Sequence, residues 1–154
     1  VLFVCLGNIC RSSMAEGAFR HHVEEAGLTE KILVDSAGTA AYHIGNLADE
    51  RMRGVAASRG LILSSKARQI EESDVETFDY ILAMDRQNFR DISDLTDHML
   101  ANLYLMRDVD EEKDVDDVPD PYYGGIEGFE DVYQMLMRST KKLLEVIINE
   151  YKIV

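Results

Sequence analysis

Short apolar runs alternate with helical periodicities along the whole chain. The apolar runs predict strands, and the residues between them predict helices, over the following ranges: strands Val1–Val4, Ile32–Val34, Tyr80–Ala83 and Leu103–Met106; helices Ser13–Ala26, Asp49–Arg59, a short one from Ser73, and Arg86–Leu95. A last helix is the clearest, because Phe129, Val132, Leu136, Leu143 and Ile147 recur at spacings of three, four or seven and so share one face.

Strands alternating with helices indicate parallel βαβ units. The pattern predicts an α/β fold, a doubly wound, three-layer, flavodoxin-like sandwich with a four-stranded parallel sheet. A chain of 154 residues predicts one domain over residues 1–154. In such sheets ligands bind beyond the carboxyl ends of the strands, which directs attention to the residues after Val4 and after the last strand.

Helix boundaries are marked by capping signals. Ser13-x-x-Glu16 predicts a capping box, and Ser73-x-x-Glu76 predicts a second helix start. Gly27 and Gly60 are expected to end the helices before them.

Composition narrows the possible functions. Apolar residues make up 46% and charged residues 29%, which is typical of globular proteins, and the net charge is −13. That charge argues against binding of nucleic acid or of anionic membranes. With no signal segment and no apolar span, a cytoplasmic location is expected, where the two cysteines favour catalytic or redox chemistry over a structural disulfide.

The first strand runs into Cys5-Leu6-Gly7-Asn8-Ile9-Cys10-Arg11-Ser12, and a helix follows at once. Loop amides and a helix N-terminus form an anion site, for which Gly7 is expected to supply a positive φ or a close backbone approach. Arg11 offers a planar fork suited to two phosphate oxygens. Cys5 lies in the same positive field, which favours its thiolate, a nucleophile aimed at phosphorus.

A second candidate is Asp120, which lies between the only two prolines of the chain, Pro119 and Pro121. Proline stiffens the backbone, so this carboxylate is held on a rigid turn, as a general acid for the leaving group requires. The alternative is that Asp120 is one of the eight acidic residues of the segment 108–120, most of which are expected to form a solvated face.

Together the segments VCLGNICRS and DPYYGG resemble the two signatures of the low-molecular-weight protein tyrosine phosphatases, also called acid phosphatases. The stretches DSAGTAAYHIGN, ARQI and FDYILAMD resemble the same family, in the same order. The resemblance implies hydrolysis of phosphotyrosine and of small aryl phosphates, with no metal or other cofactor, on a four-stranded parallel sheet.

The resemblance also implies residue roles. Cys5 would form a cysteinyl-phosphate, Arg11 would bind the phosphoryl group, and Asp120 would act as acid and then as base. Asn8 and Ser12 would hold the loop and steady the thiolate. The phosphate-binding residues would be the whole loop: Leu6, Gly7, Asn8, Ile9, Cys10, Arg11 and Ser12.

The implied substrate pocket is formed by Leu6, Ile9, Tyr42 and Tyr122, a slot that fits an aromatic ring. Cys10 would trap an oxidised Cys5 as a disulfide, with a small buried hydrophobe as the alternative. Tyr122 and Tyr123 follow acidic residues and are candidate phosphorylation sites, with a plain pocket wall as the alternative for Tyr122.

Other functions were weighed on the same residues. A phosphopeptide-binding module without turnover uses the same loop, and Asp120 at the site would discriminate against it. A thiol-coupled arsenate reductase needs cysteines beyond Cys10, which the chain lacks. The histidines, His21, His22, His43 and His98, show no metal spacing with the cysteines, so no metal is expected. Phosphotyrosine proteins are the expected partners, phosphate and vanadate the expected inhibitors, and a monomer the expected state.

Overall fold

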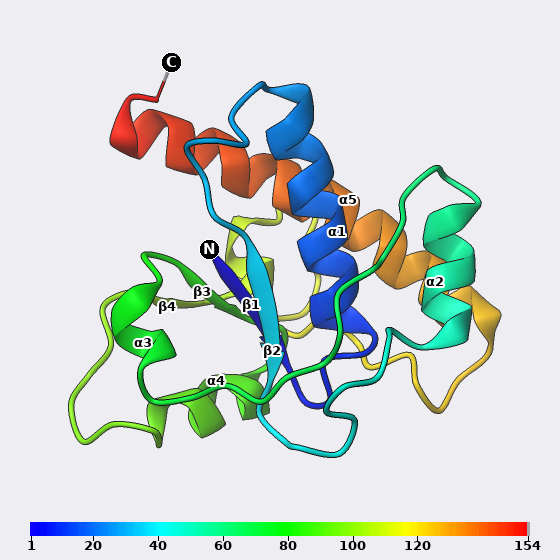
Figure 1. Cartoon of the computed structure of the whole chain (residues 1–154), viewed down its shortest axis with the longest axis horizontal. Helices are drawn as coiled ribbons and strands as arrows, with labels where there is room; N and C mark the ends of the chain where they lie inside the picture. Colours follow the sequence, from blue (N-terminus) through cyan, green and yellow to red (C-terminus); the bar gives the residue numbers. More distant parts are fainter. Residues whose placement is uncertain (154) are drawn as a thin grey trace.

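The computed structural model describes residues 1–153 and contains a four-stranded parallel sheet (Figure 1). Its strands are β1 Leu2–Cys5, β2 Asp35–Gly38, β3 Ile81–Ala83 and β4 Leu103–Leu105. They pair in the order β2-β1-β3-β4, which is the flavodoxin-like order. The expected fold class is therefore confirmed.

Helices cover both faces of the sheet. They are α1 Arg11–Glu25, α2 Glu50–Ala57, α3 Asp74–Thr77, α4 Arg86–Ser93 and α5 Ile126–Tyr151, with a 3₁₀ turn η1 over Met106–Val109. Phe3 and Leu82 point into the core shared with α1, α2 and α5, whereas Leu2, Val4 and Ile81 point into the core shared with α3 and α4. This alternation along buried strands produces the three layers.

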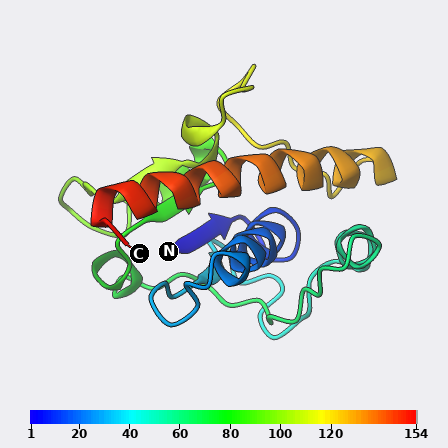
Figure 2. The same ribbon diagram turned by 90° about the horizontal axis from the view of Figure 1, so that it is seen from above.

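The last helix, α5, is the longest element and runs across the molecule along one side of the sheet (Figure 2). Its predicted apolar face is confirmed, since all five of the residues that define it are buried: Phe129, Val132, Leu136, Leu143 and Ile147. Among residues 1–153, no helix combines the length and the apolar character needed to cross a bilayer.

The second strand is misplaced by the sequence prediction. Ile32 and Val34 are buried, but the strand is the following Asp-Ser-Ala-Gly segment, Asp35–Gly38. Small residues are required there because a Cβ on Gly38 would lie 2.8 Å from the carbonyl oxygen of Leu6. Close approach of two backbones overrides the apolar pattern at this point.

The predicted capping box is also wrong. Helix α1 begins earlier, at Arg11 after Cys10, so Ser13 lies inside the helix and donates its hydroxyl to the Asn8 carbonyl at 2.8 Å. Glu16 is buried and accepts a hydrogen bond from Ser36 instead. Gly27 does adopt the positive φ expected after a helix end, 69°.

Candidate active site

The loop between β1 and α1 is fixed by backbone hydrogen bonds from its neighbours. The Thr39 and Ala40 amides donate to the carbonyls of Cys5 and Leu6, both at 2.9 Å, and the Asp49 amide donates to the Ile9 carbonyl at 2.8 Å. The N–H groups of the first turn of α1 have no acceptor within the helix. The predicted anion site therefore stands on a rigid backbone at the carboxyl end of β1.

Asn8 is the residue that gives the loop its shape. Its φ is 58°, a left-handed value that asparagine tolerates better than most residues, and its side chain is buried. Its Oδ1 accepts from the Arg68 amide at 3.1 Å, and its Nδ2 donates to Ser12 and Ser36 at 2.8 and 2.9 Å. The positive φ expected at Gly7 is therefore at Asn8; Gly7 has no positive φ and instead makes room for His43.

Cys5 is buried, and its sulfur faces two donors. The Asn8 amide is 3.3 Å from Sγ, and the Ser12 hydroxyl oxygen is 3.0 Å from it. Because Ser12 Oγ already accepts from Asn8, its proton is free to point at the sulfur. Both groups can donate to the sulfur and so can stabilise a negative charge that forms on it.

Arg11 is buried and held by groups from two other elements. Its Nη1 lies 2.6 Å from Asp85 Oδ2 and 3.1 Å from the Val118 carbonyl oxygen. Burial opposes the charge of Arg11, but the negative groups Cys5 and Asp85 outweigh it and raise the pKa of the guanidinium. Arg11 therefore stays charged and fixed in the cavity.

Asp120 reaches the same place. Its Oδ2 lies 3.5 Å from Arg11 Nη2, and its Oδ1 accepts from the Tyr122 amide at 3.1 Å, which orients the carboxylate. Its side chain is 37% exposed, so it can exchange protons with water. The structure thus brings Asp120 to Arg11 and Cys5.

The segment that carries Asp120 is anchored to α5 at Asp110. This residue is buried and accepts two hydrogen bonds from Arg138 at 2.8 Å, with Arg107 on its other side at 3.2 Å. The hydrogen bonds from Arg138 hold the pKa of Asp110 below its usual range. Most acidic residues of the segment 108–120 are exposed, as expected, and Asp110 is a buried exception.

One cavity of about 270 Å³ collects the predicted site residues. Its floor and walls include Cys5, Arg11 and Asp120 together with Leu6, Ile9, Tyr42 and Tyr122, as predicted. Tyr42 and Tyr123 are 74% and 92% exposed and lie at its mouth. Asn8 and Ser12 lie behind it, where they contact the sulfur.

Cys10 lines the cavity beside Cys5, and both thiols are free. Burial raises the pKa of Cys10, and the negative charges of Asp49 and Cys5 raise it further. Cys10 is thus a neutral thiol beside Cys5.

Several site residues were missed from the sequence. Asp85 ends the FDYILAMD stretch and also caps α4, with Oδ1 accepting from the Asn88 amide at 2.7 Å. The Asp-x-x-Asn spacing indicates this helix cap, but no local pattern indicates the contact between Asp85 and Arg11. His43 lines the cavity, and Ser36 and Glu16 extend the hydrogen-bond network behind Asn8. Their partners lie far along the chain, so spacing alone does not identify them.

The chain is similar to known proteins over almost its whole length. Residues 1–152 match the family model described as low molecular weight phosphotyrosine protein phosphatase. A human protein of that name is 43% identical over 94% of this chain and 93% of its own length. The crystal structure of a protein tyrosine phosphatase from Entamoeba histolytica superposes with a TM-score of 0.92 at 42% identity, covering 99% of this chain and 97% of the other. A Drosophila arginine phosphatase structure superposes with a TM-score of 0.87 at 31% identity, covering 95% and 96% of the two chains.

Proposed function

The chain belongs to the low molecular weight phosphotyrosine protein phosphatase family, and we propose that it hydrolyses phosphotyrosine in proteins through a cysteinyl-phosphate. The observation that carries the proposal is that Asp120 and Cys5, 115 positions apart, line one cavity with Arg11 between two carboxylates. A nucleophile, an anion-binding cation and a proton donor in one cavity are the groups that phosphate ester hydrolysis requires.

In the first step, Arg11 and the amides of the first turn of α1 bind the phosphoryl oxygens. The Cys5 sulfur attacks phosphorus, and the bond to the tyrosine oxygen breaks. The protonated Asp120 gives its proton to the departing phenolate, so the products are tyrosine and a cysteinyl-phosphate.

In the second step, the Asp120 carboxylate takes a proton from water, whose oxygen attacks the phosphorus. The sulfur–phosphorus bond breaks, phosphate leaves, and the Cys5 thiolate is restored with its donors Ser12 and Asn8 still in place. Arg11 and the amides stabilise the charge on the equatorial oxygens in both steps. No metal or other cofactor enters this sequence.

The substrate preference follows from the walls of the cavity. Leu6, Ile9 and Tyr122 form an apolar slot that accepts an aromatic ring, while a shorter phosphoserine would not bring its phosphate down to Cys5. Small aryl phosphates fit the same slot, and phosphate and vanadate are inhibitors because they occupy the anion site. Since some structural relatives are arginine phosphatases, a phosphoarginine peptide is the comparison substrate.

The central test measures phosphate release from a phosphotyrosine peptide at mildly acidic pH with excess chelator. Cys5→Ser is expected to abolish turnover, and Asp120→Ala to reduce it by about 10²–10⁴-fold. Asp116→Asn, an exposed carboxylate of the same segment, is the control and should not change the rate. Tight peptide binding without turnover by the unmodified chain would instead identify a phosphopeptide-binding module.

A second substrate separates the acid from a merely structural role. A nitrophenyl phosphate has a leaving group that needs little protonation, so Asp120→Ala should cost less with it than with the phosphotyrosine peptide. If Asp120→Ala lowered the rate equally with both substrates, Asp120 would not be the general acid.

We also infer that Cys10 protects Cys5 from irreversible oxidation. Peroxide converts the Cys5 thiolate to a sulfenic acid; the Cys10 sulfur then attacks it, a disulfide forms and water leaves. Added thiol reduces the disulfide and restores activity. Full recovery with thiol of peroxide-treated Cys10→Ser protein would contradict this role.

Tyr123 is the better placed of the two candidate phosphorylation sites. It is 92% exposed, whereas Tyr122 is half-buried, with its carbonyl bound by Arg51 at 3.1 Å. Phosphorylation of Tyr123 would put a dianion at the mouth of the cavity and repel an anionic substrate. Mass spectrometry after incubation with a tyrosine kinase, on the unmodified chain and Tyr123→Phe, tests this assignment.

A further inference from the structure

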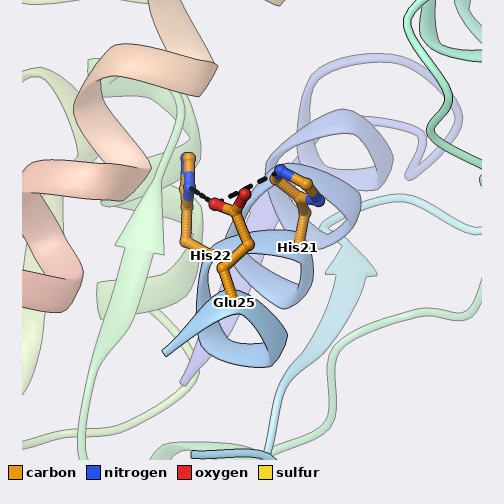
Figure 3. Close-up of side chains that lie close together, drawn as sticks. All are labelled: His21, His22 and Glu25. Atoms are coloured by element: carbon orange, nitrogen blue, oxygen red, sulfur yellow. Dashed lines mark ion pairs between the residues drawn. The ribbon is translucent and has the colours of Figure 1, made fainter. Parts of the chain in front are cut away.

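Three potential metal ligands lie side by side on the last turns of α1, away from the phosphatase cavity (Figure 3). Glu25 follows His21 by four residues and His22 by three, so both rings flank its carboxylate. The same Glu25 oxygen lies 3.4 Å from His21 Nε2 and 3.9 Å from His22 Nδ1, and one ligand atom of each residue lies within 4.8 Å of the others.

The tautomer of His22 is set by α5. The ring is packed against that helix with only 8% of the residue exposed, and Nε2 lies 3.0 Å from the Met137 carbonyl oxygen. A carbonyl can only accept, so Nε2 carries the hydrogen. In the neutral ring with this tautomer, Nδ1 presents a lone pair.

That lone pair faces a carboxylate. His22 Nδ1 and a Glu25 carboxylate oxygen, both acceptors, lie 3.9 Å apart, which is beyond hydrogen-bond distance. A cation between them would attract both atoms and offset their mutual repulsion. A histidine that donates one nitrogen to a carbonyl and offers the other outward is also the arrangement in which metal-bound histidines are held.

We propose that His21 Nε2, His22 Nδ1 and the Glu25 carboxylate bind one Zn²⁺ ion, with water at the fourth position. Two imidazole nitrogens and one carboxylate oxygen are a donor set that zinc uses in proteins. Metal–ligand bonds of about 2.0–2.1 Å put tetrahedral ligand atoms about 3.3 Å apart. The distance of 3.4 Å between His21 and Glu25 already matches, and the distance of 3.9 Å between His22 and Glu25 must shorten by about 0.6 Å. The two ring nitrogens, which lie within 4.8 Å of each other, must also move to the tetrahedral spacing.

Access and charge agree with such a site. The Glu25 side chain is 65% exposed and that of His21 37%, so an ion can enter and both side chains can adjust. Lys141 on α5 opposes a cation near His22, but it is exposed and screened by salt. The net charge of −13 attracts cations to the protein as a whole. The sequence expectation of no metal compared the histidines only with the cysteines and did not weigh Glu25.

The test is a calorimetric Zn²⁺ titration of the full chain carrying Cys5→Ser and Cys10→Ser, so that no thiol competes. We expect one Zn²⁺ per chain. In that background, Glu25→Gln and His22→Gln should each weaken binding by at least about tenfold, the loss typical even for outer partners of metal ligands. His98→Gln is the control and should bind as the parent does, because His98 is exposed and, among residues 1–153, forms an ion pair only with Asp97.

Ring nitrogen NMR signals of His21 and His22 should shift on zinc addition, while that of His98 should not. Glu25→Gln changes an exposed side chain and keeps the fold, so the test does not depend on the more buried His22. Absence of zinc binding by the parent, or equal binding by Glu25→Gln and the parent, would overturn the proposal. These readouts do not involve phosphate release, so they are independent of the proposed phosphatase activity.

Discussion

Asp85 is predicted to hold the Arg11 guanidinium, and Asp85→Asn tests that role by removing both the charge and the acceptor that Arg11 uses. Asparagine caps helices as well as aspartate, so its one carbonyl oxygen can keep the N-cap of α4. The new amide nitrogen then replaces Oδ2, and the charge-assisted contact of 2.6 Å to the 3% exposed Arg11 side chain is lost, because both groups are donors. Breaking a buried ion pair completely costs about 3–5 kcal/mol, but Asp120 and the Val118 carbonyl remain, so we expect about 2 kcal/mol.

Thermal unfolding in phosphate-free buffer measures this loss. For a chain of this size, about 2 kcal/mol corresponds to a Tm lower by about 4–8 °C. Because a bound anion supplies the missing negative charge, saturating phosphate should raise the Tm of Asp85→Asn more than that of the unmodified chain. Asp91→Asn is the control: Asp91 lies on the same helix and its carboxylate accepts a hydrogen bond from the Gln87 side chain at 2.9 Å.

The reasoning about Asp85 is refuted by either of two results. One is a Tm for Asp85→Asn within a degree or so of the Asp91→Asn control. The other is an equal gain in Tm from phosphate in Asp85→Asn and the unmodified chain, which would mean that Arg11 is not left short of a partner.

Two further substitutions address the frame of the site. Asp110→Asn should lower the free energy of unfolding by about 3 kcal/mol at pH 7, and this deficit should shrink as the pH falls below about 4. The reason is that a carboxylate whose pKa is lowered in the folded state stabilises the fold above its unfolded pKa and loses that contribution as it is protonated. Urea unfolding at pH 7 and below pH 4 checks this, and Asp116→Asn should leave the stability unchanged at both. Gly38→Ala should cost about 1–3 kcal/mol and weaken phosphate binding in a calorimetric titration, because its Cβ would meet the Leu6 carbonyl oxygen at 2.8 Å. Gly54→Ala, in α2 with nothing within 4 Å of the added Cβ, should instead stabilise by about 0.5–1 kcal/mol in thermal unfolding.

Periodicity was sufficient for the parts of the fold where burial decides. The face of α5 was predicted residue by residue, because a long amphipathic helix must bury its apolar stripe against the sheet. The strand at Asp35–Gly38 was not, because its residues are chosen to let the Cys5 loop approach rather than to fill a core. Sequence pattern reports burial well and backbone proximity poorly.

The residues of the site also divide into those that the sequence predicts and those that it does not. Cys5 and Arg11 were predicted because strand, loop and helix are contiguous, and Asp120 because the family resemblance of DPYYGG added to the weaker signal of its two flanking prolines. The partners that orient them were missed: Asp85 is 74 positions from Arg11. Contacts of that kind exist only once the sheet has brought β1 and β3 together.

Asn8 shows why the buried residues behind the cavity matter for the chemistry. Its one side chain accepts from the loop before α3, donates to Ser12 at the sulfur, and donates to Ser36, which in turn donates to the buried Glu16 at 2.5 Å. These hydrogen bonds place the Ser12 hydroxyl oxygen 3.0 Å from the Cys5 sulfur, where its hydrogen can point at Cys5. The buried carboxylate of Glu16 is thus coupled to the nucleophile through three polar side chains, which is how residues outside the cavity can bias the charge on its sulfur.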